Sequence, residues 1–173
     1  MNTPDASWVP SVMADYEKPL TRYAAHITGD VERAREVVQD TFLKLCHQKP
    51  AEIRNHLAQW LYTVCRNRAL DVRRKERRMT GISDAQLQQA YSGPELSAAL
   101  EKEEQLADVL TILNTLPANQ QEVLRLKFQS DLSYDEISRI TSFTVSNVGF
   151  LIHTGLKTIR ERVRTQPAIR RVK

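Results

Sequence analysis

Apolar residues recur every three or four positions along most of this chain, and that period limits what its 173 residues can fold into. The spacing places the apolar side chains on one face of an α-helix, whereas a half-buried strand would need strict alternation. No run alternates convincingly between turn residues, so no sheet is expected. The sequence therefore predicts an all-α protein in which each helix buries one apolar face.

Three helices are expected in the first half of the chain. The first carries an apolar stripe from Tyr16 to Ile27, and the dipeptide Gly29-Asp30 ends it. The second covers about residues 30–47, and Lys49-Pro50 separates it from the third. We expect these helices to form one small domain over residues 12–78. The expected buried stripe of the third helix is Leu57, Leu61, Val64 and Val72.

The periodicity fades after the third helix, where Ser, Gly, Gln and acidic residues accumulate. Residues 79–104 contain one basic and five acidic side chains, a net charge of −4. Residues 1–78 have 14 basic and 10 acidic side chains, and residues 105–173 have 10 and 6, so each segment has a net charge of +4. We interpret the acidic segment as a flexible linker between two basic domains. Clustered positive charge is typical of proteins that bind phosphate-bearing partners, although a solvated surface has the same composition.

The second half, residues 105–165, predicts a further set of helices. Pro94 is expected at the start of a helix that continues through Leu106 and Leu113, and Leu116-Pro117 interrupts it. A following helix is expected to carry the apolar side chains Val123, Leu124 and Phe128.

Ser133 and Glu136 then form an S-x-x-E capping box, which predicts a short helix ending near Thr141. A tight connection follows, and Thr144 is a suitable N-cap for a final helix. A short helix, a brief turn and a longer helix are typical of a helix-turn-helix, whose second helix enters the major groove of DNA. A helical hairpin inside a bundle gives the same pattern, so periodicity alone leaves both interpretations open. The expected buried stripe of the final helix is Val148, Leu151, Ile152, Leu156, Ile159 and Val163.

The side chains opposite that stripe are the candidates for reading DNA. Phe150 is unusual among them because an apolar ring stands where water is expected, and such a ring suits contact with thymine methyl groups. Lys157 is the one residue of the set with a fixed positive charge. The full set of candidates is Ser146, Asn147, Phe150, His153, Thr154 and Lys157.

Four sequence segments together resemble one known family. Residues 116–126 (LPANQQEVLRL) and 131–137 (DLSYDEI) closely resemble the opening of the C-terminal domain of bacterial sigma factors. Residues 39–45 (QDTFLKL) and 60–71 (WLYTVCRNRALD) resemble the polymerase-binding and promoter-melting segments of the same family. Their order and spacing resemble the two-domain extracytoplasmic function (ECF) group of the sigma-70 family.

The resemblance implies an initiation factor that docks on core RNA polymerase, recognises promoter DNA and helps to open the duplex. It identifies residues 12–78 with sigma region 2 and residues 105–165 with sigma region 4. The chain would then have no catalytic residues and no cofactor, because the polymerase does the chemistry. The family pattern places the polymerase contact on Gln39, Asp40, Leu43 and Lys44. Without the resemblance, an ordinary solvated helix face is the favoured explanation of these residues.

The resemblance also implies a surface that captures the melted minus-ten element. The loop ahead of the third helix, about residues 49–55, is expected to receive a flipped base, and the third helix is expected to line the strand. A solvated basic helix end is the alternative for the last part of this set. The candidates are Lys49, Arg54, Asn55, Arg66, Asn67, Arg73, Arg74 and Lys75.

The final helix departs from the family pattern. Positions where many relatives carry Lys or Arg are Gly149, Leu151, Thr154 and Leu156 in this sequence. Recognition of the minus-thirty-five element is therefore expected to be atypical in strength and in sequence.

Other functional classes find little support in the residues. No glycine-rich phosphate loop, nucleophile motif or metal-ligand spacing is present, so we expect neither an enzyme nor a metal site. Cys46 and Cys65 are too few for a disulfide scaffold, and no run of about 20 apolar residues predicts a membrane span. We expect a cytoplasmic protein with core polymerase, promoter DNA and an anti-sigma factor as partners. The alternative is a free-standing helix-turn-helix regulator.

Overall fold

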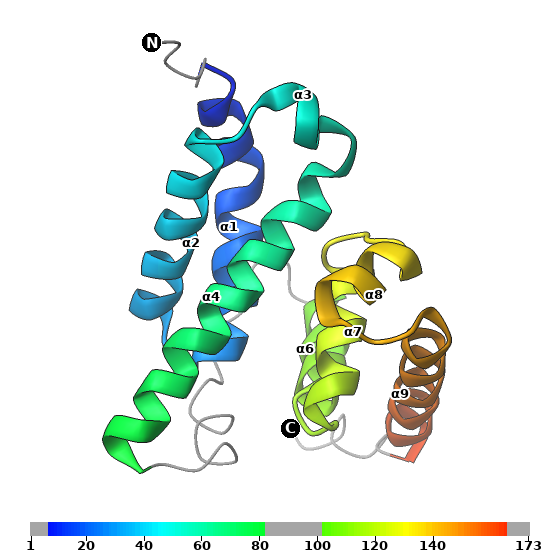
Figure 1. Cartoon of the computed structure of the whole chain (residues 1–173). Helices are drawn as coiled ribbons and strands as arrows, with labels where there is room; N and C mark the ends of the chain where they lie inside the picture. The colour runs from blue at the N-terminus through cyan, green and yellow to red at the C-terminus, as the bar shows by residue number, and fades with distance from the viewer. Residues whose placement is uncertain (1–6, 82–101, 166–173) are drawn as a thin grey trace, which may run out of the picture. The chain divides into compact units, whose positions relative to one another are not determined.

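The computed structural model describes residues 7–81 and 102–165, and every regular element within them is helical. The chain divides into two compact units, built on helices α1 to α4 and α6 to α9 (Figure 1). The predicted all-α fold is confirmed. The first unit contains α1 (Val9–Thr28), α2 (Val31–Cys46), α3 (Pro50–Ile53), the 3₁₀ turn η1 (Arg54–His56) and α4 (Leu57–Thr80). The second contains α6 (Lys102–Leu113), α7 (Ala118–Phe128), α8 (Tyr134–Thr141) and α9 (Val145–Thr165).

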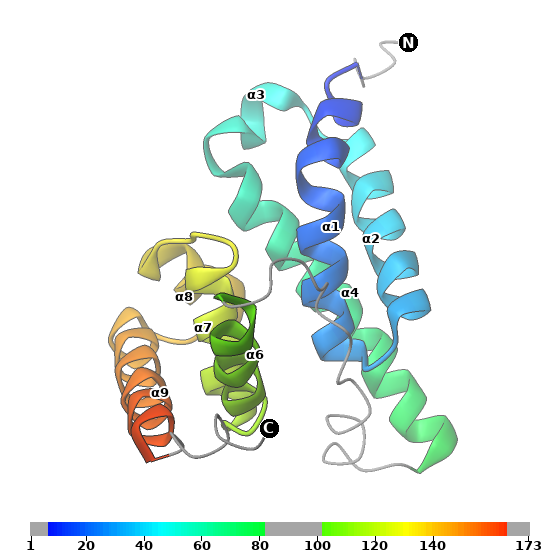
Figure 2. The same ribbon diagram turned by 180° about the vertical axis from the view of Figure 1, so that it is seen from behind.

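In the first unit, α1, α2 and α4 pack side by side around one apolar core (Figures 1 and 2). Leu20, Leu45 and Leu61 are completely buried there. The rings of Tyr23 and Tyr62 meet edge to face with centroids 5.2 Å apart, which is a favourable aromatic geometry. All three long helices therefore contribute side chains to the core.

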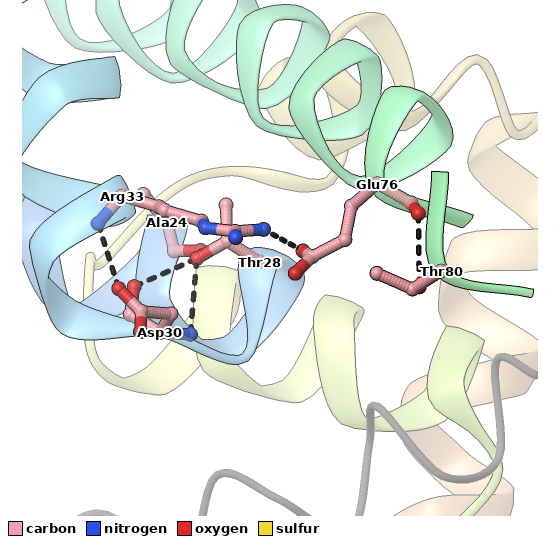
Figure 3. Close-up of polar contacts among 6 residues, drawn as sticks. All are labelled: Ala24, Thr28, Asp30, Arg33, Glu76 and Thr80. Carbon is pink, nitrogen blue, oxygen red and sulfur yellow. Dashed lines mark hydrogen bonds and ion pairs between the residues drawn. The ribbon is translucent and has the colours of Figure 1, made fainter. Parts of the chain in front are cut away.

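The break between α1 and α2 follows from local chemistry. Gly29 adopts φ 74°, a left-handed conformation that glycine reaches without strain, and its N–H donates to the Ala25 carbonyl at 2.9 Å. The Asp30 carboxylate then accepts a hydrogen bond from the Arg33 N–H at 2.8 Å and caps α2 (Figure 3). The predicted helix end at this dipeptide is confirmed. Helix α1 begins earlier than the expected stripe and buries Val9 and Val12 as well.

The buried face of α4 differs from the expected stripe. Leu61 is buried as predicted, whereas Leu57, Val64 and Val72 are only half-buried. The prediction followed the large aliphatic side chains, but α4 packs against both α1 and α2. A helix packed against two neighbours is covered over a wider arc than one aliphatic stripe, so other residue types are buried as well. The side chains of α4 that are buried are Leu61, Tyr62, Cys65 and Ala69.

The ends of the expected linker are helical. Met79 and Thr80 complete α4, which stops at Gly81 with φ 66°, and Lys102 already belongs to α6. The expected helix start at Pro94 lies outside the described residues.

The second unit packs α6 and α7 against α9. Gly155 permits the close approach of α9 to α7, because a Cβ atom there would lie 2.8 Å from the Cδ1 of Leu124. Arg125 is 4% exposed and donates to the Asn114 side-chain oxygen at 2.6 Å, which ties α7 to the end of the α6 segment.

One residue expected in a buried stripe of this unit lies in solvent instead: Val163 is 46% exposed, so that expectation was wrong. Leu106 and Phe128, which belong to the apolar pattern of their helices, are also exposed, at 58% and 62%. Phe128 is the last residue of α7. Helix α9, with 21 residues, is about 31 Å long and α7, with 11, about 16 Å, so α7 alone cannot cover the whole length of α9.

Candidate functional site

The predicted capping box starts the helix-turn-helix. The Ser133 hydroxyl accepts a hydrogen bond from the Glu136 N–H at 3.2 Å, and the Glu136 carboxylate accepts one from the Ser133 N–H at 2.8 Å. Two donors that α8 leaves without a helical partner are thereby satisfied. The four residues from Ser133 to Glu136 therefore determine where α8 begins.

The turn between α8 and α9 is held by its own side chains. Ser142 takes a left-handed conformation with φ 64°, and its N–H donates to the Ser138 carbonyl at 2.9 Å. The Ser138 hydroxyl donates to the Phe143 carbonyl at 2.6 Å, and the Thr144 hydroxyl accepts from the Asn147 N–H at 3.1 Å. These bonds set where α9 begins, and the predicted helix-turn-helix is confirmed.

Most of the residues predicted to read DNA lie on one exposed face of α9. Ser146, Asn147, His153 and Lys157 are exposed, and Phe150 has 63% of its surface in solvent. Thr154 differs, because it is half-buried and its hydroxyl accepts a hydrogen bond from the Gln120 side chain of α7 at 3.3 Å. Thr154 therefore lies at the edge of this face, where it also anchors α9 to α7.

The four predicted polymerase-binding residues share one strip of α2, which we call the α2 strip. Gln39, Leu43 and Lys44 are exposed, with Leu43 at 62%, whereas Thr41 and Phe42 between them are buried. Residues four apart lie above one another on a helix, so Gln39 stacks with Leu43 and Asp40 with Lys44.

The Asp40 carboxylate has a partner that the sequence did not reveal. Arg68 of α4 donates from its Nε to the Asp40 Oδ2 at 2.7 Å, and both side chains are about two-fifths exposed. A second ion pair between the same two helices joins Arg33 and Glu76 (Figure 3). An ion pair as exposed as the one between Asp40 and Arg68 contributes little to stability.

These pairs border a depression of about 300 Å³ between α2 and α4, whose lining includes Glu36, Asp71, Lys75 and Met79. Its lining mixes both signs of charge. Sequence spacing gave no signal for either ion pair, because Asp40 and Arg68 are 28 positions apart.

The segment expected to be a loop before α4 is mostly helical. Lys49, Arg54 and Asn55 are exposed there: Lys49 immediately precedes α3, and Arg54 and Asn55 lie on η1. Ile53 is 4% exposed and anchors the segment in the core, and Lys49 pairs with Glu52 at 3.4 Å. These three candidates are therefore presented from a folded turn.

The candidates on α4 point in different directions. Residues seven apart on a helix share a face, so Asn67 lies above Arg74, and Arg66 above Arg73. Asn67 and Arg74 are exposed, and Arg66 and Arg73 are half-buried. Lys75 follows Arg74 by about 100° around the helix and lines the depression beside α2. The structure thus brings the α4 candidates together as two strips, with Lys75 to one side.

The surroundings of Cys65 make its thiol unreactive. Burial raises the pKa of its thiol to about 12, and the hydrogen bond with the Thr41 side chain offsets only part of this shift. Its Sγ donates weakly to the Leu20 carbonyl at 3.9 Å. A thiol held in its protonated form is a packed side chain rather than a nucleophile.

In the two described ranges, no helix has the length and apolar character that crossing a bilayer requires. The same residues contain no cluster of three His, Cys, Asp or Glu side chains able to hold a metal ion. The features that remain are a helix-turn-helix, an exposed strip on α2 and basic residues along α4. This combination defines a class of helical proteins that carry a DNA-binding helix-turn-helix.

Comparison with known proteins gives the family. Residues 12–79 match the family "Sigma-70 region 2", and residues 106–159 match "Sigma-70, region 4". The ECF RNA polymerase sigma factor EcfG of Rhodopseudomonas palustris is 31% identical over 131 residues, which cover 75% of this chain and 70% of the relative. The chain belongs to the ECF group of the sigma-70 family, and it is an RNA polymerase sigma factor that directs transcription initiation.

Other relatives support this assignment. SigL of Mycobacterium tuberculosis is 28% identical over 162 residues, covering 90% of this chain and 89% of the relative, and SigM of Bacillus subtilis is 28% identical over 133 residues, covering 76% and 80%. The solved complex of the sigma factor RpoE with the anti-sigma factor NepR from Bartonella quintana shares the fold. Its TM-score is 0.65 at 20% identity, with 91% of this chain and 97% of the other covered.

Family membership decides two of the sequence predictions. Sigma factors are not enzymes, so the expected lack of catalytic activity is confirmed. The alternative of a free-standing regulator does not hold, because the first half of the chain matches sigma region 2.

Proposed function

We propose that the α2 strip is the surface that docks on core RNA polymerase. The observation that carries this proposal is Leu43, which is 62% exposed between the polar residues of the strip. A large apolar side chain beside a carboxylate and an amide fits the composition of a protein interface, where an apolar centre is surrounded by polar groups. The Asp40 carboxylate adds charge complementarity for a basic partner helix, which favours rapid docking.

We further propose a division of the DNA contacts between the two units. The α3–α4 surface, with Lys49, Arg54 and Asn55 ahead of the α4 strips, captures the melted minus-ten element. Basic residues along a groove suit the phosphates of a single strand, and exposed polar groups suit an extruded base. The exposed face of α9 reads the minus-thirty-five element in the major groove.

An anti-sigma factor is the third proposed partner. The sigma factor RpoE, which shares this fold, was solved bound to the anti-sigma factor NepR. A protein that covered the α2 strip would exclude polymerase by direct competition. Since transcribing polymerase works in the cytoplasm, we propose that this chain acts there.

Binding of the labelled full chain to purified core polymerase tests the docking site. Asp40→Arg is expected to weaken binding at least ten-fold, because it places a positive charge against a basic partner and beside Arg68. Leu43→Ala is expected to weaken binding while leaving the Asp40–Arg68 pair intact. Weaker binding by this variant would therefore reflect lost docking and not a broken contact between α2 and α4.

Asp15→Arg is the matched control, since Asp15 is exposed on α1 outside the strip. It carries the same charge reversal and is expected to bind as the wild type does. Wild-type affinity in both strip variants would contradict docking through this surface.

A further inference from the structure

Phe150 occupies the centre of the exposed face of α9. Ser146 and Asn147 lie one turn before it, and His153 lies one turn after it. The Phe150 ring is 63% exposed, so an apolar group stands in water among three polar neighbours. Burial of such a ring in a partner would be favourable, so the position invites a contact.

The direction of this ring is set by the packing of α9. Val148, Leu151 and Ile152, on either side of Phe150 in the sequence, are all buried, which fixes the rotation of the helix. The Thr154 hydroxyl donates to the Phe150 carbonyl at 2.9 Å while it accepts from Gln120 of α7. Phe150 therefore points away from the core because its neighbours in the sequence point into it.

The chemistry of the major groove offers one apolar group to such a side chain. Guanine, cytosine and adenine present hydrogen-bond donors and acceptors there, and thymine adds its 5-methyl group. A phenyl ring makes no hydrogen bond to a base edge. It favours thymine by burying the methyl group, and it disfavours the other bases because their polar edges would be left without a partner. Asn147 and Ser146 supply hydrogen-bonding groups for adjacent base edges.

We propose that Phe150 is a specificity-determining residue that contacts the 5-methyl group of a thymine in the upstream promoter element. This proposal rests on the proposed function of α9. It predicts that promoter choice by this sigma factor depends on a thymine methyl group as well as on hydrogen bonds to the bases.

The test begins with holoenzyme assembled from core polymerase and the full chain. A pool of duplex DNA with a randomised upstream region is selected for holoenzyme binding, and each thymine of the selected element is then replaced by deoxyuridine. Deoxyuridine pairs as thymine does but lacks the methyl group. Removal of one buried methyl is expected to weaken wild-type binding about four-fold at one position.

Phe150→Ala is expected to bind the thymine and deoxyuridine promoters equally well. Phe128→Ala is the matched control, because Phe128 is 62% exposed at the end of α7 and lies outside the helix-turn-helix. It is expected to retain the four-fold preference for thymine. Phe150→Leu, which keeps an apolar side chain, is expected to retain part of it.

Each contrary result has a distinct meaning. Wild-type holoenzyme that is indifferent to every methyl group, or Phe150→Ala that keeps the preference, would overturn the proposal. Loss of core polymerase affinity in Phe150→Ala, with the methyl preference intact, would assign the ring to a protein contact instead. Selection that enriches no upstream sequence would overturn the proposed role of α9 itself.

Discussion

At the scale of single residues, two glycines of the same helix have different roles. A Cβ atom at Gly155 would lie 2.8 Å from Leu124, whose side chain is 3% exposed in the core of the second unit. A Cβ at Gly149 would meet the Tyr134 ring at 3.5 Å, an ordinary van der Waals distance. Only at Gly155 would a Cβ atom force a neighbouring side chain to shift.

Gly155→Ala is expected to lower the free energy of unfolding by about 1 kcal/mol, since overpacking outweighs the gain in helix propensity. Gly149→Ala is the matched variant and is expected to raise it by up to about 1 kcal/mol. Urea unfolding followed by circular dichroism measures both. Equal stability of the two variants would show that Leu124 repacks freely and that the contact does not constrain α9.

At the scale of elements, different faces of α4 have different roles. One face carries Leu61 and Cys65 into the core, and another holds Arg68 against α2. The strip formed by Asn67 and Arg74 remains exposed. A consecutive run of basic residues on a helix spreads over three directions, so the run Arg73 to Lys75 is not one DNA-binding face.

Arg74 is expected to contribute to phosphate binding, although it also pairs with Asp71 at 3.2 Å. In Arg74→Ala, the slope of log affinity against log salt for holoenzyme and promoter is expected to fall by about 0.7, the value for one phosphate of a single strand. Arg35→Ala is the control, because Arg35 is exposed on α2 and pairs with Glu32 there. An unchanged slope in Arg74→Ala would remove this residue from the DNA surface.

At the scale of the whole molecule, the two units each have a core of their own. Leu20, Leu45 and Leu61 are buried in the first, and Val123, Ile137 and Val148 in the second. Units of this size bury only about 60% of the surface that their unfolded chains expose, so their stability is modest. Separate cores nevertheless permit separate folding.

We expect fragments 1–81 and 102–173 each to unfold cooperatively when heated, as followed by circular dichroism. The reason is that the ion pairs and the capping interactions described for each unit lie within its own fragment. A fragment that shows no cooperative transition would mean that its core depends on the rest of the chain.

The local features were predictable from the sequence because the groups that make them are close along the chain. The end of α1 at Gly29, the capping box of Ser133 and Glu136, and the N-cap Thr144 all involve partners within four residues. Helix boundaries and the helix-turn-helix follow from such short-range bonds. The four family segments could be recognised for the same reason, since each is a continuous stretch.

The features that were not predictable depend on which helices meet. The Asp40–Arg68 pair, the attachment of Thr154 to Gln120 and the exposure of Phe128 and Val163 have no short-range signal. Periodicity identifies a face as apolar, but the neighbour's length and distance decide how much of that face is covered. The sequence by itself determined the helices, their caps and the family, through interactions within a turn or two. Only the tertiary structure decided which side chains of those helices are buried, paired or left for a partner, because burial and pairing require two segments to meet in space.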